Sequence, residues 1–197
     1  MGETLRIFLD VGANKGQVLW VALQEKYKFD RIHCFEPVEC LCDVLQNFKD
    51  DRVTIHPFGL SNSTGKLTLY NPGRVCGSIY PRHGVSNIEQ ICNFIKARDW
   101  FRSNLDMSNQ NIMKLNCEGS ECDILDDLIE SGEINKIDTV MVDFDIRKIR
   151  SQKYREKELR LKLKSLKNTN VLFCEEVAIG KTHIERTQNW LNIAGVS

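Results

Sequence analysis

The sequence predicts an α/β fold in which a doubly wound, mainly parallel sheet is covered by helices on both faces. Two observations predict it. Short apolar runs alternate along the chain with segments of helical period, and no internal repeat is present. The first apolar run ends in a turn that contains Gly12 and Gly16, which is typical of the first strand, loop and helix of a nucleotide-binding unit.

The first half of the chain is expected to hold three strands of this sheet, at residues 6–11, 31–35 and 53–56. Helices are predicted at residues 16–25, 37–48 and 87–96. Pro37 would take the first helical position, where its missing N–H removes no hydrogen bond. The alternating segment 66–70 follows a turn and predicts an extra strand.

The second half continues the same alternation, with strands predicted at residues 111–116, 138–144 and 171–175. Helices are predicted at residues 120–131 and 147–167, followed by a last segment around Trp190 and Leu191. The helix 147–167 is strongly basic and places Leu159, Leu163 and Leu166 on one face. A solvated helix lying on the sheet explains this pattern, and an RNA contact is the alternative.

Length and composition favour one domain over residues 1–197, with a motif-bearing core at about 5–145 and the basic helix and last strands at 146–197. The apolar runs are far shorter than the roughly 20 residues of a membrane span. Acidic and basic residues interrupt the N-terminus, unlike a secretory signal. We therefore expect a cytoplasmic protein without a membrane partner.

The chain has eight cysteines, most of them inside apolar segments, which favours buried free thiols over a disulfide scaffold. The spacing of Cys117 and Cys122 does not match the two-residue knuckles of structural zinc sites. The sequence predicts no metal site.

Polar motifs follow four of the predicted strands, where a sheet of this kind binds its ligand. Asp10 closes the first strand, Glu36 closes the second, and the segments 59–62 and 116–119 follow the third and fourth. We expect these residues to meet at one edge of the sheet.

The first loop favours an adenosine ligand without phosphates over a dinucleotide. A dinucleotide site needs Gly-x-Gly-x-x-Gly, and Asn14 stands where the second glycine would let a pyrophosphate approach. Asp10 would repel phosphate but favour the ammonium and sulfonium of S-adenosylmethionine. Glu36 follows Gly16 by 20 residues, a spacing at which a carboxylate can accept both ribose hydroxyls.

Four motifs, in this order, resemble those of the FkbM family of S-adenosylmethionine-dependent methyltransferases: Asp-Val-Gly-Ala-Asn-x-Gly at 10–16, Phe-Glu-Pro at 35–37, Gly-Leu-Ser-Asn at 59–62 with Gly65, and Lys-Leu-Asn-Cys-Glu-Gly-Ser-Glu at 114–121. The resemblance covers residues 5–145. It implies a seven-stranded class I methyltransferase sheet (Rossmann-like) and O-methylation of a sugar or natural product.

The resemblance also implies which residues hold the cofactor: the first loop the methionine part, Glu36 the ribose, and the segment near Asn62 the adenine. The candidate cofactor residues are Asp10, Gly12, Ala13, Asn14, Gly16, Glu36, Pro37, Ser61, Asn62 and Asn116.

The fourth motif departs from the family pattern, because Asn116 stands where the family usually has an aspartate. An amide can hydrogen-bond a substrate but cannot take a proton as a carboxylate would. The candidate catalytic residues are Asn116, Glu118 and Glu121. The segment 142–145 also lacks the histidine that the family tends to show nearby.

Substrate selection is expected from the insertions 71–86 and 99–109, which hold Arg74, Tyr80, Arg82, His83, Trp100, Phe101 and Arg102. These residue types suit a small polar or glycosylated acceptor. Of the other histidines, His33 is expected to be packed, His56 to lie near the adenine, and His183 to belong to a polar tail.

Three functions remain open: a small-molecule or glycan O-methyltransferase, a cofactor-binding module without catalysis, and an RNA methyltransferase that uses the basic helix. A homo-oligomer is also left open by the sequence.

Overall fold

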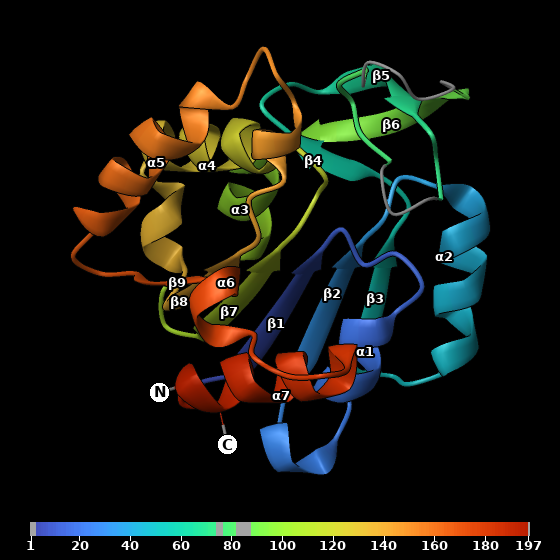
Figure 1. Cartoon of the computed structure of the whole chain (residues 1–197). Coiled ribbons are helices and arrows are strands. Elements are labelled where there is room, and N and C mark those ends of the chain that lie inside the picture. The colour runs from blue at the N-terminus through green and yellow to red at the C-terminus, as the bar shows by residue number, and fades with distance from the viewer. Residues whose placement is uncertain (1–2, 74–76, 82–87, 197) are drawn as a thin grey trace.

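The computed structural model describes residues 3–73, 77–81 and 88–196, and a six-stranded parallel sheet forms its centre (Figure 1). The strands are β1 (Arg6–Val11), β2 (Arg31–Phe35), β3 (Val53–His56), β7 (Gln110–Leu115), β8 (Thr139–Val142) and β9 (Asn170–Phe173). Their spatial order is β3-β2-β1-β7-β8-β9, and every neighbouring pair is parallel. Strand order therefore reverses between β1 and β7, which confirms the doubly wound prediction.

Helices cover both faces of the sheet (Figure 1). One face carries α1 (Gln17–Ala22), α2 (Glu39–Leu45) and α7 (His183–Ile193), and the other carries α3 (Ala97–Asn104), α4 (Glu121–Ser131) and α5 (Tyr154–Lys164). Phe8 and Trp190 are packed into the first core, with ring centroids 5.9 Å apart. Leu9, Phe101 and Leu159 belong to the second core. The alternating directions of β1 side chains thus feed two separate cores.

A second, three-stranded sheet lies beside the carboxyl ends of the main strands (Figure 1). It contains β4 (Gly59–Ser61), β5 (Gly65–Tyr70) and β6 (Glu89–Lys96), in the order β4-β6-β5. The predicted extra strand at 66–70 is confirmed as β5. The predicted helix at 87–96 is wrong, because β6 pairs with strands on both sides and buries alternate residues, Cys92 and Phe94.

The segment 99–109 was expected to be a substrate loop, and this expectation is also wrong. Its first part forms α3, and Trp100 and Phe101 are buried in the core instead of facing a ligand. The aromatic residues of this segment therefore serve packing.

The end of the chain differs from the seven-stranded sheet that the resemblance implied. Over the described residues the main sheet has six strands, and the chain after β9 forms α6 (Cys174–Val177) and α7. A capping box starts α7: the Thr182 side chain accepts from the Glu185 N–H, and the Glu185 carboxylate accepts from the Thr182 N–H. This local signal, with Trp190 and Leu191 buried one turn further along, favours a helix over a returning strand.

Smaller differences concern the ends of elements. The basic helix predicted at 147–167 is shorter: α5 covers only Tyr154–Lys164, and a 3-10 turn at Ile146–Lys148 comes before it. The helix predicted from Pro37 begins at Glu39, with Val38 in the extended conformation before it. The strand predicted through Glu175 ends at Phe173. Within the described residues no helix is long and apolar enough to cross a membrane, and the cysteines that the structure describes carry free thiols.

Candidate functional site

A cavity of about 860 Å³ lies at the carboxyl ends of the parallel strands. Residues that follow four neighbouring strands of the main sheet, β1, β2, β3 and β7, line it: Gly12, Glu36, Gly59 and Asn116. This position, at the point where the strand order reverses, is where open α/β sheets bind ligands. The volume lies in the range of small-molecule sites. The sequence-based expectation that these motifs meet at one edge of the sheet is confirmed for Glu36, for Gly59 and Leu60, and for Asn116, but not for Asp10, Ser61 and Asn62.

The first loop uses its own backbone N–H groups to hold its shape. The N–H groups of Gly12 and Ala13 both donate to the carbonyl of Phe35, at 3.1 and 3.0 Å, and that of Asn14 donates to the Glu36 carboxylate at 2.9 Å. The Gly16 N–H donates to the Ala13 carbonyl. A phosphate-binding loop needs such groups aimed at the ligand. These four groups are directed instead at the protein.

The two glycines of this loop serve different needs. A Cβ on Gly12 would lie 2.0 Å from the carbonyl oxygen of Asn116, and the residue has a φ of 81°. Gly12 is therefore required by the close approach of two strand ends. A Cβ on Gly16 would collide with the Phe48 ring at 2.6 Å, so Gly16 serves helix packing and lies outside the described cavity lining.

Glu36 lines the cavity with only 5% of its surface exposed. Its Oε1 accepts from the Val38 N–H at 3.0 Å and its Oε2 from the Asn14 N–H at 2.9 Å. Burial raises the pKa of this carboxyl, although the two backbone N–H groups and Lys114 act against the rise. Each oxygen has a further lone pair, so the carboxylate can still accept a pair of ligand hydroxyls.

Asp10 is placed differently from the expectation that it faces the ligand. Its side chain has no exposed surface, and the described lining of the cavity does not include it. Lys114 Nζ lies 3.0 Å from its Oδ1 and donates to the Gly12 carbonyl at 2.8 Å. Burial alone would lower the pKa of Lys114, but the adjacent Asp10 carboxylate raises it overall. The charge of Asp10 is therefore balanced inside the protein, and it gives no argument for a cationic ligand.

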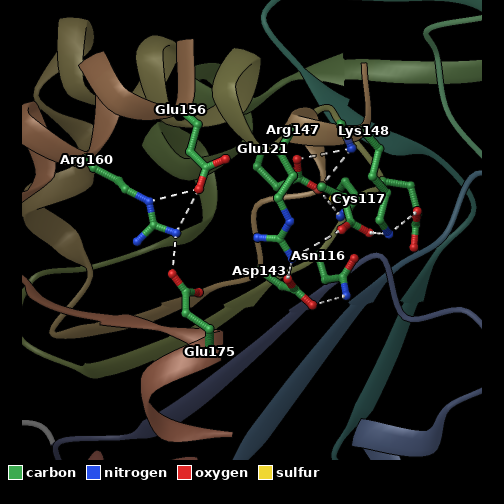
Figure 2. A network of polar contacts seen from close by, with 12 residues as sticks. Asn116, Cys117, Glu121, Asp143, Arg147, Lys148, Glu156, Arg160 and Glu175 are labelled. Carbon is green, nitrogen blue, oxygen red and sulfur yellow. Dashed lines mark hydrogen bonds and ion pairs between the residues drawn. The ribbon is translucent and has the colours of Figure 1, made fainter. Parts of the chain in front are cut away.

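The loop after β7 carries the fourth motif, and Figure 2 shows its side chains converging with those that follow β8. Asn116 and Glu118 line the cavity. Glu121 lies beneath the loop: its Oε1 accepts from the Cys117 N–H at 2.8 Å and from the Gly119 N–H at 3.0 Å. Burial raises the pKa of Glu121 to about 7. Glu121 holds the loop in place and, in the described structure, does not reach the cavity.

A polar network joins this loop to the segment after β8 (Figure 2). Asn116 Nδ2 donates to Asp143 Oδ2 at 3.2 Å, and Arg147 lies 3.6 Å from Asp143 Oδ1. Lys148 lies 2.5 Å from Asp145 and 3.4 Å from Glu118. Burial and the nearby charge of Asp145 raise the pKa of Asp143, and Arg147 opposes the rise. The acids that follow β8 are thus balanced by two cations of the next turn.

The second sheet supplies an apolar wall of the cavity that sequence reasoning missed. Leu60, Leu69 and Phe94 from its three strands line the cavity together with Leu41 of α2. Apolar Cys92 and Phe94 alternate with a polar residue between them, which is typical of a strand. The prediction of a helix at 87–96 did not take this alternation into account. This wall suits the flat apolar faces of a heterocycle.

The residues expected near the adenine lie outside the described lining. Ser61 is buried in β4, and Asn62 is exposed. Pro37, in contrast, lines the cavity beside Glu36, as do Ala13 and Asn14 of the first loop. The segment after β3 thus contributes through Gly59 and Leu60 of β4, two positions before the predicted residues.

Two histidines, His56 and His183, differ from their expected roles, whereas His33 is packed as expected. His183, expected in a polar tail, begins α7 and lines the cavity. His33 Nδ1 and His56 Nε2 lie 3.1 Å apart, and both rings contact Trp100. His56 stacks on Phe35 and belongs to this aromatic cluster, not to the described cavity lining.

Arg74, Arg82 and His83, expected to select the substrate, lie outside the described residues. Tyr80 is described: its hydroxyl donates to Asp123 Oδ2 at 2.6 Å, so it is fixed to α4.

Several basic side chains of helix α5 form ion pairs with acidic side chains of the same chain. Arg155 pairs with Asp123 at 2.8 Å and with Asp126 at 3.2 Å, and Lys162 pairs with Asp126 at 2.7 Å. Arg160 lies against Glu156 and Glu175 (Figure 2). These contacts, with Leu159 and Leu163 buried, support the interpretation of α5 as a helix packed on the domain.

Fold and site together define a Rossmann-like α/β domain with a nucleoside-sized cavity at its switch point. No protein-family model matches the chain, and no curated protein matches it. Among solved structures the chain is similar to the crystal structure of methyltransferase FkbM from Methylobacillus flagellatus KT, at 18% identity and a TM-score of 0.48. The similar region covers 83% of this chain but only 38% of that one.

Proposed function

We propose that this domain binds S-adenosylmethionine and transfers its methyl group to a hydroxyl of a small polar, sugar or natural-product acceptor. Two features of the cavity together carry the proposal. Glu36 presents a carboxylate to it, and the N–H groups of the first loop already donate hydrogen bonds within the protein. A carboxylate in this place suits the two ribose hydroxyls of a nucleoside. A loop with no N–H groups left to donate at Gly12, Ala13 and Asn14 does not suit a pyrophosphate.

The residues present fit this cofactor along the whole cavity. Ala13, Asn14 and Gly12 would lie along the methionine part, and Glu36 and Pro37 at the ribose. The apolar wall of Leu60, Leu69 and Phe94 would receive the adenine. Asp10 is buried and does not favour this cofactor by its charge. The room in the cavity and the hydrogen-bond capacity of its lining favour it instead.

S-adenosylmethionine supplies an electrophilic methyl group that an aligned nucleophile displaces in line. Positioning of donor and acceptor can supply much of the acceleration of such a step. Asn116 and Glu118 line the same cavity and would contact the acceptor, and Glu121 would act only by holding their loop. Asn116 in place of an acid therefore does not exclude turnover.

The test is the shift in thermal unfolding caused by S-adenosylmethionine and by S-adenosylhomocysteine, measured on the wild-type chain and on Glu36→Ala. A ligand at 100 times its dissociation constant should add about 2.7 kcal/mol of stability. We expect a shift with both ligands in the wild type and its loss in Glu36→Ala. Equal shifts in the two proteins would remove Glu36 from the site. Binding without methyl transfer to any acceptor would favour a cofactor-binding module.

A further inference from the structure

Asn116 and Asp143 form a pair in which only one member reaches the cavity. Asn116 follows β7 and lines the cavity; Asp143 follows β8 and is not in the described lining. The two side chains meet at 3.2 Å, between Asn116 Nδ2 and Asp143 Oδ2 (Figure 2). Register places these strand ends side by side, since Leu115 is the partner of Val142 in the parallel pair.

The pair determines which end of the Asn116 amide faces a ligand. An ionised carboxylate only accepts hydrogen bonds, so the amide nitrogen must point toward Asp143. Oδ1 of Asn116 is then the end that remains for the cavity. Asp143 has further neighbours: Arg147 lies 3.6 Å from its Oδ1, and the Cys174 side chain hydrogen-bonds to the carboxylate. The contact with Asn116 uses Oδ2.

We propose that Asp143 is a positioning residue that fixes Asn116 with its carbonyl oxygen toward the methyl acceptor, so that the site selects a neutral O–H or N–H nucleophile. The oxygen accepts the acceptor's hydrogen and thereby aims its lone pair at the methyl carbon. A carboxylate or phenolate acceptor has no hydrogen to donate and is repelled by the same oxygen. This inference rests on the proposed methyl transfer.

The electron and proton balance of the step is simple. The acceptor's lone pair forms the new bond to the methyl carbon, and the sulfur keeps the electron pair of the bond that breaks. The acceptor's proton leaves to water at the open side of the cavity. Asn116 Oδ1 accepts the hydrogen bond from this proton while the methyl group moves, and the bond ends when the proton leaves; Asn116 does not itself take the proton, which agrees with the weak basicity of an amide oxygen.

The test uses sinefungin, an analogue in which a carbon bearing an amine replaces the methylated sulfur. The N–H groups of sinefungin lie where the transferred methyl group would lie. They can donate to Asn116 Oδ1 when the amide has the proposed orientation. The quantity measured by calorimetry is the affinity for sinefungin relative to that for S-adenosylhomocysteine, which has no such amine. S-adenosylhomocysteine binding alone tests the proposed function, so the two ideas can fail separately.

Three variants separate orientation from charge. In Asp143→Ala the amide is free to turn, and we expect the relative affinity for sinefungin to fall about tenfold, the loss of one charge-assisted hydrogen bond. In Asp143→Asn the new carbonyl can still accept from Asn116 Nδ2, and the relative affinity should stay within about threefold of the wild type. Arg147→Ala removes an ion-pair partner of Asp143 Oδ1 and leaves Oδ2, the oxygen that accepts from Asn116, in place. It is the matched control and should not lower the relative affinity.

Two results would overturn the proposal. If Asp143→Asn falls as far as Asp143→Ala, the effect is that of a lost negative charge near a cation, and orientation has no part in it. If neither variant changes the relative affinity while S-adenosylhomocysteine still binds, Asn116 does not face the methyl group. Circular dichroism of each variant checks that the fold is kept.

Discussion

At the scale of single residues, Gly12 is the glycine at which a side chain would be least tolerated. Its positive φ and the Asn116 carbonyl at 2.0 Å from a built Cβ are independent constraints. The first is a cost of backbone conformation, and the second a collision with backbone that cannot turn away.

We therefore predict that Gly12→Ala destabilises the protein by more than about 2 kcal/mol, measured by urea unfolding. Gly195→Ala is the matched control, because Gly195 has a φ of 73° and open space around its Cβ. It should cost only about 1 kcal/mol, the conformational part alone. Equal losses in the two variants would show that the approach of Asn116 is relieved by relaxation.

Glu36 shows which properties of a site residue can be predicted from the sequence and which cannot. Its spacing from the glycine loop predicted a cavity-lining carboxylate, and the structure places it there. That it also holds Asn14 and Val38 could not be read from spacing, because those contacts depend on how the two loops meet.

At the scale of elements, the loop after β7 depends on a buried acid at the start of α4. Ser120 stands at the N-cap of this helix, but its side chain makes no capping hydrogen bond. Glu121 instead accepts from the backbone N–H groups of the loop. A capping hydroxyl would accept from N–H groups of the first helical turn, whereas Glu121 accepts from N–H groups of the preceding loop. Sequence alone does not decide which of these contacts forms.

Glu121 has a consequence for the dependence of stability on pH. Burial raises its pKa from 4.5 to about 7, so between these values the folded protein holds a proton that the unfolded chain has lost. Its contribution to the free energy of unfolding therefore falls as the pH rises from 4.5 to about 7. Glu121→Gln keeps an oxygen for both N–H groups and should remove this fall, as measured by urea unfolding across that range. Curves for wild type and variant that stay parallel would contradict the assignment.

The three-stranded sheet can be tested along one strand. Phe94 is buried against the cavity, whereas Ile91 of the same strand is 70% exposed. We predict that Phe94→Ala lowers stability by about 2–4 kcal/mol and weakens binding of S-adenosylhomocysteine. Ile91→Ala should change neither by a measurable amount. Retained affinity in Phe94→Ala would mean that the adenine lies elsewhere in the cavity.

At the scale of the whole molecule, the main sheet could be predicted strand by strand because its apolar runs are short and separated by clear turns. The second sheet and the C-terminal helices could not. A strand such as β6, with an exposed Ile91 between buried Cys92 and polar neighbours, has a mixed period, and only its two pairing partners decide its conformation. Likewise, Trp190 is helical because it fills the core beside Phe8.

The His33 and His56 pair joins the neighbouring strands β2 and β3 and gives a second pH prediction. Burial lowers the pKa of each ring from 6.5 to about 4, with a smaller contribution from the charge of Arg31 for His33 and of His33 for His56. Below pH 6.5 the unfolded chain gains protons that the folded protein does not, so stability falls as the pH drops toward 4.

We predict that His56→Phe, which keeps a ring to stack on Phe35, reduces this acid loss. The difference in free energy of unfolding between wild type and variant should shift in favour of the variant as the pH falls from 6.5 to 4. Thermal or urea unfolding at several pH values checks it, and a difference independent of pH would contradict it. Glu121 changes the free energy of unfolding with pH in the opposite direction. The two contributions are therefore separated by comparing each variant, Glu121→Gln and His56→Phe, with the wild type.

The central claim is that this domain binds an adenosine cofactor without phosphates, and titration calorimetry tests it most directly. S-adenosylhomocysteine and NAD are titrated into the same preparation under the same conditions. The first loop and Glu36 predict one site per chain for S-adenosylhomocysteine and no binding of NAD at equal concentration. Binding of NAD with no heat from S-adenosylhomocysteine would contradict the claim.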